Sequence, residues 1–62
     1  MSRYDFEEAV AKVIGKEMSF EYRWMIEGTW NNGHEPQVAI DTVMRCHRIE
    51  MAALMNFIME KK

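Results

Sequence analysis

Residues 36–60 read PQVAIDTVMRCHRIEMAALMNFIME. Mostly apolar residues recur along this stretch at alternating intervals of four and three, which is the spacing of one face of an α-helix. The positions of this stripe, all apolar except His47, are Ile40, Met44, His47, Met51, Leu54 and Ile58. Pro36 suits the first turn of a helix, and Lys61 and Lys62 would complement the negative end of its dipole. We therefore predict one helix from about residue 36 to about residue 60.

The first half of the chain repeats this spacing. Its stripe consists of Phe6, Val10, Val13, Glu17, Phe20 and Trp24. Asp5 and Glu8 have the spacing of a capping box, which marks the beginning of a helix. Gly28 is suited to end one, because glycine readily adopts the left-handed conformation found after a last helical turn. The pattern predicts a helix over residues 5–27.

Two residues could interrupt this first helix. Gly15 lowers helix stability in an interior position, and Ser19 could cap a separate second helix. The apolar spacing nevertheless keeps its phase from Val13 to Phe20, and a break would normally shift that phase. We therefore favour a continuous helix.

A turn separates the two helical patterns. Residues 28–35 contain Asn32-Gly33, a pair that favours positive φ, and no alternating strand pattern flanks it. We predict an all-α fold with a single domain over residues 1–62, an antiparallel hairpin of two long helices. Toward the C-terminus the apolar arc becomes too wide for one neighbouring helix to cover. A homodimeric four-helix bundle would cover it.

Size and composition narrow the functional classes. A 62-residue chain is marginally stable alone, and its single Cys46 excludes an internal disulfide. The net charge of −2 is not that of a typical nucleic-acid-binding protein. The longest apolar run, residues 51–55, is far shorter than a membrane span. The free cysteine and the lack of an export signal favour the cytoplasm.

Three polar residues interrupt the two apolar stripes. In a hairpin that turns near residue 32, Glu17 and His47 lie side by side, and Glu21 follows Glu17 by one turn. Such a layer can fix helix register, which is the interpretation we favour. Alternatively, these carboxylates and the imidazole could bind iron, manganese or zinc, although the usual Glu-x-x-His order is reversed at His47 and Glu50. We expect no cofactor.

No catalytic arrangement is recognisable. His34 lies in the turn without a nucleophile beside it in the sequence. Cys46 and His47 are adjacent, so on a helix their side chains point about 100° apart and do not form a catalytic pair. We predict a protein that is not an enzyme.

Two regions are candidates for contact with other molecules. Met51, Met55 and Met59 follow one another at helical spacing, with Phe57 beside them, and methionine suits adaptable interfaces. Trp30 lies in a polar turn, where it could either cover the end of the hairpin or anchor a partner. The predicted interface residues are Met51, Met55, Phe57, Met59 and Trp30.

These observations favour a small protein that forms a homodimer. They also favour binding and modulation of another macromolecule, most simply a protein. Its size and expected architecture are similar to those of small dimeric helical-hairpin regulators carried by plasmids and phages, a likeness of architecture only. Two alternatives stay open. One is RNA or DNA binding through Arg45 and Arg48, with Arg23 on the first helix. The other is a metal-binding bundle that uses Glu17, Glu21 and His47.

Overall fold

Four helices and no strand make up residues 1–60, the part of the chain that the computed structural model describes. The helices are α1 (Arg3–Ile14), α2 (Lys16–Glu21), α3 (Arg23–Asn31) and α4 (Pro36–Glu60). Lys61 and Lys62, expected to complement the dipole of the last helix, lie outside the described residues. None of the helices described is long and apolar enough to cross a membrane. The all-α prediction is confirmed.

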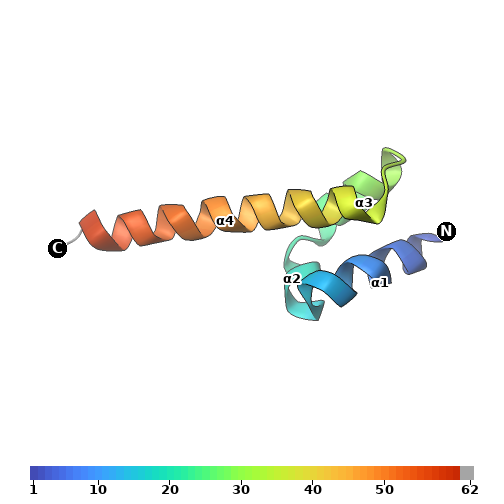
Figure 1. The fold of residues 1–62 in the computed structure, drawn as a ribbon, viewed down its shortest axis with the longest axis horizontal. Coiled ribbons are helices and arrows are strands. Elements are labelled where there is room, and N and C mark those ends of the chain that lie inside the picture. Colours follow the sequence, from blue (N-terminus) through green and yellow to red (C-terminus); the bar gives the residue numbers. More distant parts are fainter. Residues whose placement is uncertain (61–62) are drawn as a thin grey trace.

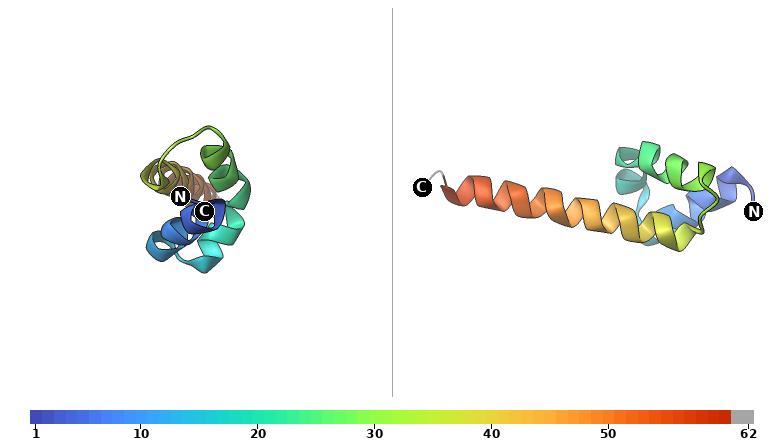
Figure 2. Two further views of the ribbon diagram at one scale, coloured as in Figure 1. Left: turned by 90° about the vertical axis from the view of Figure 1, so that its right-hand side faces the viewer. Right: turned by 90° about the horizontal axis from the view of Figure 1, so that it is seen from above.

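The molecule has a head and an arm. The helices α1 and α3 pack on the first half of α4, and α2 packs on α1 and α3. Together they form the head, residues 3–47, while the rest of α4 extends beyond it (Figures 1 and 2). We call residues 48–60 the arm. The N-terminus lies at the head end and the arm points away from it, so the molecule is elongated, with extents of 49 × 20 × 15 Å.

The first break in the N-terminal helical region is at Gly15. Its φ of 94° and ψ of 155° belong to a backbone region that is essentially restricted to glycine. The N–H of Gly15 still donates to the carbonyl of Ala11 at 2.8 Å and closes α1. At the other end, the hydroxyl of Ser2 accepts from the N–H of Asp5 at 3.2 Å, so Ser2 caps α1 instead of Asp5. The prediction of one continuous helix over residues 5–27 is wrong.

The second break is at Tyr22, between α2 and α3. Its φ of −106° and ψ of 23° depart from helical values, and its carbonyl accepts from the N–H groups of Met25 and Ile26 at 3.0 and 3.1 Å. Ser19, the alternative helix start considered from the sequence, lies inside α2. Together the two breaks turn the chain back on itself, so that α3 returns alongside α1, as Figure 1 shows.

The turn before α4 is shorter than the predicted loop of residues 28–35, because α3 continues through Gly28 to Asn31. Gly33 has φ 77°, the conformation expected of the Asn32-Gly33 pair. The N–H of His34 donates to the carbonyl of Thr29 at 3.2 Å and closes the turn. The observed bounds of α4, Pro36–Glu60, coincide with those expected from the sequence.

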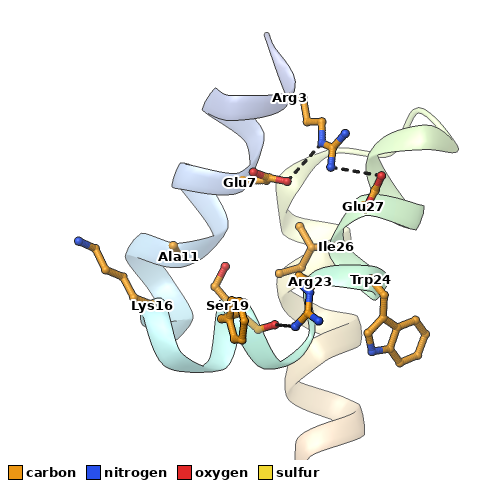
Figure 3. A pocket seen from close by; sticks show the side chains of 10 residues that line it. Arg3, Glu7, Ala11, Lys16, Ser19, Arg23, Trp24, Ile26 and Glu27 are labelled. Atoms are coloured by element: carbon orange, nitrogen blue, oxygen red, sulfur yellow. Dashed lines mark hydrogen bonds and ion pairs between the residues drawn. The ribbon is translucent and has the colours of Figure 1, made fainter.

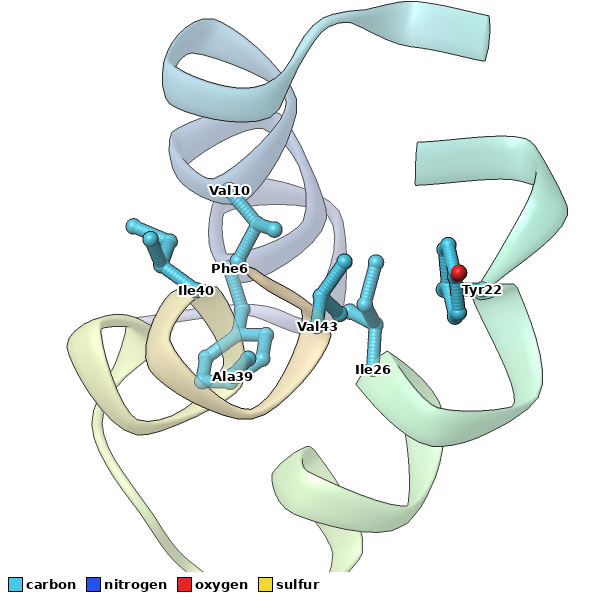
Figure 4. Packing of buried hydrophobic residues seen from close by; sticks show 7 residues of the cluster. All are labelled: Phe6, Val10, Tyr22, Ile26, Ala39, Ile40 and Val43. Carbon is cyan, nitrogen blue, oxygen red and sulfur yellow. The ribbon is translucent and has the colours of Figure 1, made fainter. Parts of the chain in front are cut away.

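The core lies entirely within the head (Figure 4). Its members come from α1, from α3 and the residue before it, and from the first half of α4. They are Phe6, Val10, Tyr22, Ile26, Ala39, Ile40 and Val43. Of the predicted stripes, Phe6, Val10 and Ile40 are buried as expected.

Other members of the stripes lie outside the core. Val13, Phe20 and Trp24 are 65%, 69% and 67% exposed, although the sequence predicted them on the seam. The breaks at Gly15 and Tyr22 change the helical phase that the prediction assumed for Phe20 and Trp24. Val13 precedes both breaks, in the last turn of α1, and its exposure has no such explanation.

Candidate functional site

The arm is the most unusual surface of the described chain. Every residue from Arg48 to Glu60 is exposed, although the first half of the same helix buries Ala39, Ile40 and Val43. Its large apolar side chains are between 47% and 67% exposed: Ile49, Met51, Leu54, Met55, Phe57, Ile58 and Met59. Apolar side chains in such density mark association surfaces in soluble proteins.

The arm continues the face of α4 that the head covers. Ile40 and Val43 are 8% and 0% exposed, because α1 and α3 pack on that side of the helix. Met51, Leu54 and Ile58 follow on the same side at helical spacing, yet they are 47%, 51% and 53% exposed. The apolar stripe is therefore longer than the head that packs on it.

Tyr22 marks the place where the arm leaves the head. Its hydroxyl donates to Oε2 of Glu50 at 2.7 Å, and its ring meets the His47 ring edge-on at 6.4 Å between centroids. Tyr22 is 4% exposed. These contacts fix the direction of α4 at the junction, because they join α3 to the first residues of the arm.

The hydrogen bond also changes the acidity of the phenol. Donation to the Glu50 carboxylate, together with burial and the negative charge of Glu50, raises the pKa of Tyr22 to about 12. The neutral phenol can donate this hydrogen bond, whereas a phenolate would repel the carboxylate. The junction is therefore stable at neutral pH and sensitive to strongly alkaline conditions.

A second surface feature is a cleft of about 410 Å³ on the head between α1, α2 and α3 (Figure 3). Its lining includes Ile26 together with Phe20 and Trp24, the two aromatic residues whose exposure the sequence did not predict. Arg3 closes one end through ion pairs with Glu7 at 3.3 Å and Glu27 at 3.2 Å.

The opposite end of the cleft carries a stacked cation. The Arg23 guanidinium lies 4.4 Å from the centroid of the Phe20 ring and donates to the Phe20 carbonyl at 2.9 Å. The cleft therefore combines apolar walls with charged rims, and its chemistry suits a small amphipathic group.

The predicted interface residues occupy two separate places. Met51, Met55, Phe57 and Met59 all lie on the arm. Trp30 lies in the last turn of α3, half-buried, with its ring 5.4 Å from the Phe6 ring centroid. Trp30 thus packs against one side of the core.

The predicted polar layer of Glu17, Glu21 and His47 does not form in the described chain. Glu17 and Glu21 are exposed on α2, whereas His47 packs on Tyr22. Tyr22, five positions after Glu17, takes the predicted place of Glu17 because the breaks in the first helix shift the register. Among residues 1–60, no group of three or more His, Cys, Asp or Glu side chains is arranged to hold a metal ion.

Sequence reasoning missed the role of Tyr22 and the existence of the cleft. Tyr22 and Ile26 are four residues apart, so they share a helical face, and this spacing was a usable signal. The cleft had no comparable signal, since it depends on the backbone reversal at Gly15.

Comparison of the chain with protein-family models, with curated proteins and with solved structures finds no match.

Proposed function

We propose that this protein is non-enzymatic and works by binding and modulating another protein, with the arm as its association surface. The observation that carries the proposal is the exposure of Met51, Leu54 and Ile58 on a helix whose preceding turns bury the same face. A helix face of this kind typically packs against a second helix. The homodimer expected from the sequence is the simplest association of this kind, and it is part of the proposal.

The amount of exposed surface supports association. The chain exposes 5041 Å², whereas a compact monomer of 7.4 kDa exposes about 4,200 Å². The radius of gyration of 13.7 Å likewise exceeds the roughly 10.5 Å of a compact 62-residue chain. The surplus of about 800 Å² equals the area that each partner contributes to a protein–protein interface of standard size.

The charge distribution favours protein over nucleic acid as the partner. Arg45 and Arg48 border a shallow hollow on α4, but Asp41 lies beside them. Two arginines beside an acidic residue, on a chain of net charge −2, provide little of the electrostatic attraction that phosphate binding requires. The arm, in contrast, carries mainly apolar side chains.

The experiment measures solution mass by light scattering after size exclusion, over a wide range of concentrations. Leu54→Glu places a charge on the apolar face of the arm and should abolish association. Ile49→Glu is the matched control, because Ile49 is 63% exposed and lies on the opposite side of the same helix. Both variants should keep the helical content of the wild type. Equal association of the two variants would overturn the arm as the association surface.

A further inference from the structure

We propose that the arm binds the arm of a second copy of this chain in antiparallel orientation, with the two heads at opposite ends of the dimer. This inference rests on the proposed role of the arm as an association surface. It differs from the predicted four-helix bundle, in which two long hairpins would pack along their whole length.

The position of the head excludes a parallel pair in register. The face of α4 that would pair is the one carrying Ile40, Leu54 and Ile58. Around Ile40 this face is already covered by α1 and α3, and Ile40 is 8% exposed. A second α4 in parallel register would have to occupy the same space as these helices. Only the arm is open to a partner on this side.

The spacing of the seam residues is the same in both chain directions, which suits an antiparallel pair. His47, Met51, Leu54 and Ile58 are separated by intervals of four, three and four, which read the same in both directions. In an antiparallel pair centred between Ala52 and Ala53, Met51 faces Leu54 of the second copy. His47 then faces Ile58 of the second copy. Each apolar residue of the seam meets another seam position, as packing between two helices requires.

The length of the arm also fits this arrangement. In the same register, Glu60 of the second copy comes level with Arg45, at the edge of the head. The last described residues of the second arm therefore lie beside the junction formed by Tyr22 and His47. The second copy would extend the core of the head, where His47 is half-buried in the single chain.

Among residues 48–60, the flanks of the seam bring no like charges together. Arg48 comes level with a point midway between Met55 and Met59 of the second copy, on the same edge of the interface. The aliphatic part of an arginine side chain can cover an apolar neighbour while its guanidinium stays in water. The pairing thus leaves the charged groups at the rim.

The test measures distances between identical spin labels in the full-length chain with Cys46→Ala, which removes the native thiol. One label is attached to Asp41→Cys and the other, in a separate protein, to Ile49→Cys; both positions are exposed. In the antiparallel pair the axial separation falls from about 35 Å at position 41 to about 10 Å at position 49, at 1.5 Å per residue. Circular dichroism and light scattering of each labelled chain confirm that fold and mass are unchanged.

A mass of two chains with this decrease in distance supports the proposal. Similar short distances at both positions would show a parallel pair and overturn the antiparallel arrangement, while leaving the arm as the association surface. If the wild type, Leu54→Glu and Ile49→Glu are all monomeric at every concentration, the arm is not an association surface. That result would overturn the proposed role of the arm and the antiparallel pair together. The two failures are therefore distinguishable.

Discussion

The hydroxyl of Tyr22 donates a 2.7 Å hydrogen bond to Glu50 at the point where α4 leaves the head. The two residues are 28 positions apart in the sequence. Tyr22 is also the residue at which α2 ends and α3 begins. One side chain therefore connects the second break of the N-terminal helical region with the start of the arm.

The Tyr22–Glu50 hydrogen bond should make stability sensitive to alkaline pH. Its formation and the burial of the phenol raise the pKa of Tyr22 from 10.0 to about 12 in the folded chain. A raised pKa in the folded state means that the stabilisation is complete below about pH 10 and is lost as the pH approaches about 12. Thermal unfolding measured at intervals between pH 8 and pH 12 should show this loss.

Tyr22→Phe is the control for this titration. The variant lacks the phenol, so its melting temperature should be lower than that of the wild type at pH 8. The difference between the two proteins should shrink as the pH rises toward 12. A difference that stays constant over this range would show that ionisation of Tyr22 is not linked to folding.

Gly15→Ala should destabilise the head. The φ of 94° and ψ of 155° at Gly15 are strained for a residue with a Cβ, at a cost of about 1–3 kcal/mol. A Cβ at this position would meet nothing within 4 Å, so the expected loss comes from backbone strain and not from a clash. Urea denaturation followed by circular dichroism measures the change in the free energy of unfolding.

Gly28→Ala is the matched variant. Gly28 lies inside α3, and a Cβ there would also meet nothing within 4 Å. Alanine at a helical position should stabilise the chain by about 0.5–1 kcal/mol. If Gly15→Ala stabilised the chain as Gly28→Ala does, the backbone at Gly15 would not require glycine.

Ile26 and Ile58 offer a comparison between the core and the arm. Ile26 is 1% exposed, and Ile26→Ala should cost about 2–5 kcal/mol. A chain of this size rarely has more than about 3–5 kcal/mol of stability from a single core. We therefore expect Ile26→Ala to be largely unfolded at room temperature, as judged by circular dichroism and one-dimensional NMR.

Ile58→Ala should behave differently, because Ile58 is 53% exposed in the single chain. In dilute solution the substitution should change stability by less than about 0.5 kcal/mol. At high concentration the wild-type melting temperature should rise through association, and Ile58→Ala should weaken this rise. A wild-type melting temperature that does not depend on concentration would contradict this expectation.

The two tryptophans should differ in fluorescence. Trp24 is 67% exposed beside the cleft, whereas Trp30 is half-buried against Phe6. Trp30→Phe leaves Trp24, which should emit at longer wavelength and be quenched strongly by acrylamide. Trp24→Phe leaves Trp30, which should be protected severalfold. Equal quenching of the two variants would contradict the exposed position of Trp24.

The sequence predicts the helical content and the long C-terminal helix well, because both depend on local periodicity. The buried positions Phe6, Val10 and Ile40 follow from the same pattern. The breaks at Gly15 and Tyr22 do not, because the apolar spacing from Val13 to Phe20 continues through them. The phase of a pattern indicates a continuous helix only if no residue adopts a non-helical backbone conformation.

The predicted meeting of Glu17 and His47 failed for the same reason. The prediction required two straight helices and a known position of the turn between them. Because the chain changes direction at Gly15, Glu17 does not lie opposite His47. The exposed methionines of the arm were easier to find, since their helical spacing needs only α4 itself. Local patterns thus indicated the candidate surface, but they did not determine which residues of different helices lie opposite one another.

The single helix α4 should consist of two parts with different rates of amide hydrogen exchange. Its first turns carry Ala39, Ile40 and Val43, so their amides should exchange only when the head unfolds. The arm contributes no buried side chain among residues 48–60, so its amides can exchange by fraying from the C-terminal end. A partner that covers the arm should slow exchange there most, and the boundary of protection would then move along the helix toward its C-terminus.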